Sequence, residues 1–108
     1  MSGSENDMNG RFDTEIVERD ENESVEPDLW KVLLHNDHYT TMEFVIEVVK
    51  SVFGKSVIEA TVIMLDVHRK GVGVAGAYTY DIAKTKAESV HRRARERSFP
   101  LKCSVEKA

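Results

Sequence analysis

The residues best suited to chemistry are a short polar segment and the apolar faces of two predicted helices. The polar segment is Asn36-Asp37-His38. Methionine is unbranched and deformable, so two methionines beside β-branched residues suit the wall of a pocket for a large side chain. The residues in question are Met42 and Val45 in the first helix and Met64, Val67 and His68 in the second. Spacing alone favours another interpretation, in which both methionines and His68 belong to an ordinary core.

Other kinds of site find little support. The four histidines, His35, His38, His68 and His91, show no pair three or four positions apart on one helix with a carboxylate partner, so no metal is expected. Residues 71–76, GVGVAG, lack the spacing and the following helix of a nucleotide-binding loop, so no cofactor is expected. Cys103 alternates inward on a predicted strand, which indicates a buried structural thiol rather than a nucleophile. We therefore expect no enzymatic activity.

Composition places the chain among soluble single domains. It has 108 residues, a formal net charge of −4, 41% hydrophobic and 31% charged residues. No apolar run is long enough to span a membrane, and no secretory signal is evident. The single cysteine fits a reducing compartment, so a cytoplasmic protein is expected. The arginines at 92–97 are interpreted as a solvated helix face rather than a nucleic-acid site.

Charge divides the chain into two parts. Residues 1–27 contain nine acidic and two basic residues and few large apolar ones. Such a segment cannot bury enough apolar surface to offset the entropy of ordering, so a disordered acidic N-terminal extension is predicted. Residues 28–108 are mildly basic and carry the periodic patterns of a folded core.

Hydrophobic periodicity predicts six elements in this core. Alternation predicts strands near 30–35 and 101–105, and a run of small and β-branched residues predicts another at 71–78. Capping boxes at Thr40/Glu43 and Ser56/Glu59 open helices that end at Gly54 and near Lys70, and a third helix runs from Thr79 until Pro100 ends it. We expect a compact α+β domain, β-α-α-β-α-β, with three helices packed on a three-stranded antiparallel sheet. So small a core favours a binding module over an enzyme.

Four segments in this order resemble the ClpS adaptor family. They are Lys31–Val45 (KVLLHNDHYTTMEFV), Ala60–His68 (ATVIMLDVH), Thr85-Lys86 in the third helix and the ending Phe99–Ala108 (FPLKCSVEKA). The resemblance covers residues 30–108. It implies an adaptor of the N-end rule, which binds proteins with N-terminal Phe, Tyr, Trp or Leu. It would deliver them to the N-terminal domain of ClpA or ClpC, the unfoldase of the ClpP protease.

The resemblance also implies roles for particular residues. Asn36, His38 and His68, with Asp37 beside them, would bind the substrate's α-amino group. Asp81 and Lys86 would contact the unfoldase. The side-chain pocket would be formed by Leu34, Thr40, Met42, Val45, Met64, Val67 and Leu101.

The implied chemistry follows from the residue types, although the chain departs from the family at one of the amine-binding positions. An N-terminal ammonium has three donors and needs acceptors such as an amide oxygen, a neutral imidazole or a carboxylate. Family members often carry aspartate where this chain has His38. Met42 would crowd side chains branched at Cβ, so N-terminal Ile and Val should bind worse. A monomer is expected. The alternative is a recruiting domain like the C-terminal domain of ribosomal protein L7/L12, which has this element order and needs no pocket.

Overall fold

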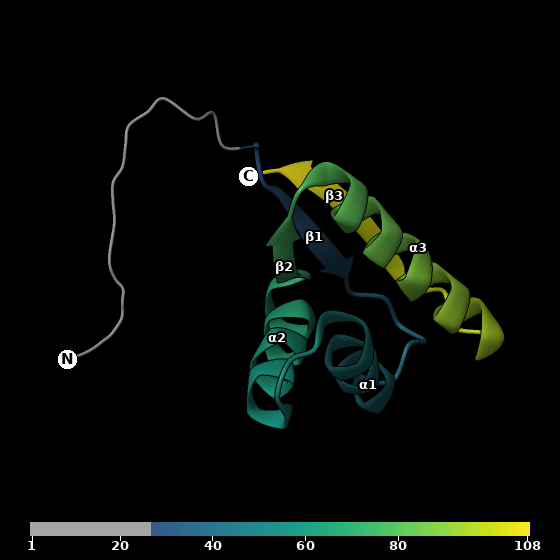
Figure 1. The fold of residues 1–108 in the computed structure, drawn as a ribbon. Coiled ribbons are helices and arrows are strands. Elements are labelled where there is room, and N and C mark those ends of the chain that lie inside the picture. Colours follow the sequence, from purple (N-terminus) through teal and green to yellow (C-terminus); the bar gives the residue numbers. More distant parts are fainter. Residues whose placement is uncertain (1–26) are drawn as a thin grey trace.

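The computed structural model describes residues 27–108, so the predicted extension, apart from Pro27, lies outside the described residues. The element order is the predicted β-α-α-β-α-β (Figure 1). The elements are β1 (Trp30–His35), α1 (Met42–Phe53), α2 (Val57–Lys70), β2 (Val72–Tyr78), α3 (Tyr80–Glu96) and β3 (Lys102–Lys107).

The three strands form one antiparallel sheet in the order β2-β1-β3, as expected. The central strand β1 alternates between the core and the open face: Val32 and Leu34 are fully buried, whereas Lys31, Leu33 and His35 are partly exposed. The register of β1 against β2 shifts between Val32 and Leu33. α1 and α2 pack against each other where β1 ends and β2 begins, and α3 contacts both β3 and β1 (Figure 1).

The helices begin and end close to the predicted positions, with one correction. The capping box of Ser56 and Glu59 at α2 is confirmed, with both reciprocal hydrogen bonds present. The box of Thr40 and Glu43 is wrong, because the N-cap of α1 is Thr41, whose hydroxyl accepts from the Phe44 N–H at 3.1 Å. Thr40 is held in the preceding loop instead. α1 and α2 end at Gly54 and Gly71, both with positive φ, as C-cap glycines commonly do.

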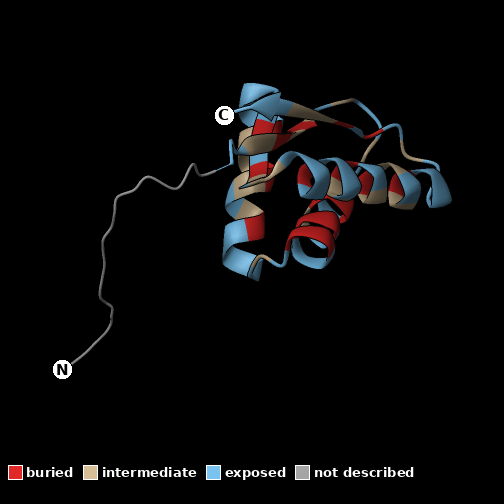
Figure 2. Cartoon of the chain, turned by 45° about the horizontal axis from the view of Figure 1, so that its top comes forward, coloured by how far each residue is buried: buried red, intermediate tan, exposed pale blue. Residues whose placement is uncertain are grey.

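The core lies where the helices meet the sheet (Figure 2). The small-residue stripe of α3, Ala83, Ala87, Val90 and Ala94, is buried, which lets this helix approach the sheet closely. α1 contributes Val48 and Val49, both almost fully buried, and β1 contributes Val32 and Leu34. A hollow lies beyond the end of β1, where α1 and α2 meet the loop that follows the strand.

Candidate functional site

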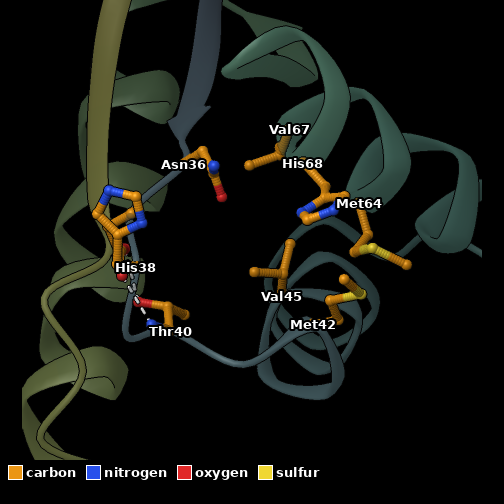
Figure 3. Close-up of a pocket in the computed structure, with 9 residues that line it drawn as sticks. Asn36, His38, Thr40, Met42, Val45, Met64, Val67 and His68 are labelled. Carbon is orange, nitrogen blue, oxygen red and sulfur yellow. Dashed lines mark hydrogen bonds between the residues drawn. The ribbon is translucent and has the colours of Figure 1, made fainter.

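A cavity of about 260 Å³ opens beyond the end of β1 (Figure 3). Asn36, His38 and Thr40 lie on one side of it, and residues of α2 lie on the other (Figure 3). The cavity brings together nine of the predicted site residues: Asn36, Asp37, His38, Thr40, Met42, Val45, Met64, Val67 and His68. A hollow of 150 Å³ already accommodates benzene, so this cavity has room for the ring of a phenylalanine side chain.

The carboxylate of Asp37 holds the loop between β1 and α1 in shape. Its Oδ1 accepts from the N–H groups of Tyr39 at 2.8 Å and Thr40 at 2.7 Å, and its Oδ2 accepts from the Thr40 hydroxyl at 2.7 Å. Partial burial raises the pKa of this carboxyl, but the hydrogen bonds from Thr40 and Tyr39 and the nearby His38 outweigh it, so the pKa is lowered overall. The main role of the Asp37 carboxylate is therefore to stabilise the conformation of the loop itself.

One backbone hydrogen bond brings this loop to the end of α2. The Asn36 N–H donates to the carbonyl of Gly71 at 2.9 Å, and the Gly71 N–H donates to the carbonyl of Val67 at 3.0 Å. Because His68 lies in the last turn of α2, these two bonds fix its backbone relative to Asn36. The amide of Asn36 and the ring of His68 consequently lie at the same cavity (Figure 3).

The apolar wall comes from α1 and α2. Val45, Met64 and Val67 are buried and Met42 is 45% exposed at the first residue of α1. His68 is exposed, so the interpretation of Met42 and His68 as ordinary core residues is wrong. Met64 is both a core residue and a cavity residue, because it is only 7% exposed and also lines the cavity.

Two of the predicted pocket residues do not line the cavity. Leu34 and Leu101 are buried in the core, at 0% and 4% exposure. Leu34 lies in β1 just before the polar loop, and Leu101 immediately precedes β3. At these positions they pack the domain that carries the cavity wall.

The two predicted unfoldase contacts differ in their surroundings. Asp81 is exposed in the first turn of α3. Lys86 is partly buried: its Nζ donates to the carbonyl of Val52 at 2.8 Å and lies 5.2 Å from the centre of the Tyr78 ring. Lys86 therefore links α3 to the end of α1, a contact that the sequence analysis did not anticipate.

The remaining reactive side chains have structural partners. The imidazole Nε2 of His91 accepts from the Cys103 N–H at 3.0 Å, and that of His35 lies 2.6 Å from the Ser104 hydroxyl. Burial raises the pKa of the Cys103 thiol to about 12, so this cysteine is a protonated core residue, as predicted. Within residues 27–108 there is no cluster of three or more potential metal ligands. No helix in this same part of the chain could cross a membrane.

The cavity thus combines hydrogen-bond acceptors with an apolar interior. An amide oxygen and imidazole nitrogens can accept from a cationic group, and the methionine and valine wall can take a large apolar side chain. Both features lie within one cavity of about 260 Å³, so a ligand that uses them carries its amino group and its apolar group close together. The α-amino group and side chain of one amino-acid residue meet this requirement.

Known proteins are similar to this chain in sequence and in fold. Residues 25–104 match the family described as ATP-dependent Clp protease adaptor protein ClpS. The chain is similar to the ATP-dependent Clp protease adapter protein ClpS of Syntrophus aciditrophicus, with 51% identity over 94% of this chain and 95% of that one. It is also similar to the protein of the same name from Desulfatibacillum aliphaticivorans, with 64% identity over 74% of this chain and 77% of the relative.

A solved structure supports the comparison. The structure of Agrobacterium tumefaciens ClpS2 bound to L-phenylalaninamide superimposes with a TM-score of 0.74 at 40% identity, over 77% of this chain and all of that one. Fold, site and sequence together place the chain among small adaptor domains. The chain belongs to the ClpS family of adaptors of the ATP-dependent Clp protease.

Proposed function

We propose that this protein binds polypeptides whose N-terminal residue is Phe, Tyr, Trp or Leu and delivers them to ClpA or ClpC for degradation by ClpP. The observation that carries the proposal is the single cavity that joins Asn36, His38 and His68 to an apolar wall. The A. tumefaciens relative was solved with L-phenylalaninamide, a ligand with one amino group and one benzyl side chain.

The energetics require both parts of the cavity. Burial of a Phe or Leu side chain contributes about 2 kcal/mol, whereas micromolar affinity needs about 8 kcal/mol. Hydrogen bonds from the ammonium to the acceptors would supply part of the difference. Acetylation of the peptide removes the charge and leaves the acceptors facing an amide, which should cost several kcal/mol.

The proposal extends to the cellular role. The protein would act without catalysis of its own, as a cytoplasmic monomer, with Asp81 and Lys86 in contact with the N-terminal domain of the unfoldase. Residues 1–27 would engage the unfoldase during delivery. Neither nucleic acid nor a membrane would take part.

Fluorescence anisotropy with short labelled peptides tests the binding step. The peptides differ only at residue one, which is Phe, Leu, Ile, Ser or acetylated Phe. We expect low-micromolar binding of Phe and Leu peptides alone, and a loss of at least tenfold in His68→Ala. Arg69→Ala is the matched control, since Arg69 is exposed on the next position of α2 and does not line the cavity. Equal or absent binding across the set would favour a recruiting surface that uses no pocket.

A further inference from the structure

A second hollow adjoins the cavity through the loop after β1. It is an open groove of about 650 Å³ formed by that loop, the end of α3 and the turn before β3, and it is lined by Tyr39, Arg95, Ser98, Phe99 and Pro100. Within the loop after β1, His38 and Thr40 line the first cavity, whereas Tyr39, which lies between them in the sequence, lines the groove. The same short loop therefore borders both hollows.

The groove offers an aromatic ring and a cation to solvent. Tyr39 is 76% exposed, yet its backbone is held in place by the hydrogen bond from its N–H to Asp37. Arg95 is also exposed, and no ion pair within residues 27–108 engages its guanidinium. Its neighbour Arg97 is already paired with Glu47 at 3.4 Å. Among the residues that the structure describes, none occupies the guanidinium of Arg95, so it can pair with an anionic group of a ligand.

The turn after α3 gives the groove a defined wall. The Phe99 N–H donates to the Ala94 carbonyl at 2.8 Å and the Ser98 N–H donates to the Arg95 carbonyl at 3.1 Å, which is the Schellman pattern of helix ends. Ser98 occupies the position that glycine usually takes, with φ of 60°. The turn therefore holds Phe99 and Pro100 at the groove through hydrogen bonds to the end of the helix.

We propose that this groove binds the residues that follow the N-terminal residue of the bound polypeptide, and that Arg95 favours carboxylate side chains there. The inference rests on the proposed function. An extended chain advances about 3.3–3.6 Å per residue, so the second to fourth residues reach about 10 Å beyond the cavity. Tyr39 and Phe99 contact the apolar parts of these residues, and Arg95 pairs with their carboxylates. Exposed ion pairs of this kind change affinity about two- to fivefold.

Competition experiments at low ionic strength test the preference. The competitors share an N-terminal Phe and carry Glu, Gln or Lys at positions two to four. The intact protein should bind them in the order Glu, Gln, Lys, although its net charge of −4 favours the opposite order. Arg95→Glu should reverse the order, and Arg95→Gln should remove the difference.

Lys84→Glu is the matched control. Lys84 is exposed on the same helix, about 16 Å from Arg95 by the helical rise, and gives the same change of net charge. It should keep the order of the intact protein. L-phenylalaninamide is too short to reach the groove, so its affinity should be the same in all variants, which also verifies that they fold.

The outcomes separate the two proposals. If L-phenylalaninamide binds but the three peptides compete equally, or if Lys84→Glu changes the order as Arg95→Glu does, the groove has no part in recognition and the inference is overturned. If L-phenylalaninamide does not bind, the proposed function itself fails, and the inference with it.

Discussion

At the scale of single residues, Met42 is the most exposed of the apolar side chains that line the cavity. It is 45% exposed, whereas the other apolar lining residues, Val45, Met64 and Val67, are buried. Met42→Ala should widen the entrance, because the thioether that would meet a Cβ branch is removed. We expect peptides that begin with Ile or Val to gain about tenfold in affinity, with little change for Leu, in anisotropy titrations.

A comparison of Met42→Ala with Met64→Ala separates an effect on the shape of the cavity from an effect on the stability of the fold. Truncation of the exposed Met42 should leave urea denaturation nearly unchanged, whereas Met64→Ala should cost about 2–5 kcal/mol because it opens a hole in the core. Ile peptides that still bind far more weakly than Leu peptides to Met42→Ala would show that another residue excludes the Cβ branch.

The carboxylate of Asp37 stabilises the loop with a defined dependence on pH. Asp37→Asn keeps one acceptor but loses the charge and the second oxygen, so we expect a loss of about 1 kcal/mol at pH 7. Since folding lowers the pKa of Asp37 below its ordinary value of 3.8, this contribution is complete above that pH and disappears as the pH falls below it. Urea denaturation of the intact protein and of Asp37→Asn between pH 7 and pH 3 measures this contribution. If the difference in their free energies of unfolding stays constant down to pH 3, this role of Asp37 is contradicted.

At the scale of elements, the end of α3 carries a local strain. Ser98 has a positive φ, a conformation that costs an L-residue about 1–2 kcal/mol. Ser98→Gly should therefore stabilise the protein by about 0.5–1 kcal/mol in urea denaturation, after allowance for the greater freedom of glycine in the unfolded chain. Ser89→Gly in the middle of the same helix is the control, and it should destabilise by about 1 kcal/mol. If both substitutions lower the free energy of unfolding, Ser98 is not strained.

The loop after β1 shows why elements begin where they do. The sequence offers Thr40 and Thr41 in succession, and Thr40 with Glu43 has the spacing of a capping box. Asp37 binds both the N–H and the hydroxyl of Thr40, so Thr41 caps α1 instead. The two hydrogen bonds from Thr40 to Asp37 thus decide between two caps of similar intrinsic quality.

At the scale of the whole molecule, Lys86 joins two helices that are far apart in the chain. Its ammonium donates to a carbonyl at the negative end of α1 and lies over the rings of Phe53 and Tyr78. Lys86→Met keeps the apolar stem and should lower the free energy of unfolding by about 1–2 kcal/mol. Lys84→Met, on the exposed side of α3, should change it by less than about 0.5 kcal/mol in the same urea denaturation. An equal loss in both variants would show that the contact with Val52 contributes nothing.

The structural role of Lys86 affects how the proposed contact with the unfoldase is tested. A variant of Lys86 loses a contact that links two helices as well as a surface charge, whereas Asp81 is exposed and Asp81→Asn changes the surface with only a small loss at the start of α3. Binding of the unfoldase domain should therefore be measured first with Asp81→Asn. The change should appear more in the association rate than in affinity, since exposed charges act mainly on encounter.

The amino-acid sequence by itself determined the element order and the buried stripe of α3, and it drew attention to the residues of the cavity without deciding between a pocket and an ordinary core. These follow from local patterns, because periodicity, glycine caps and a polar interruption are read within a few positions of one another. The tertiary structure decided which of these residues meet. The bond from Asn36 to Gly71 places His68 at the polar loop, and burial places Leu34 and Leu101 in the core instead of on the cavity wall. The tie from Lys86 to α1 and the groove beside Tyr39 also join segments distant in the chain. Such contacts depend on how packed elements are placed, which no spacing within a single element encodes.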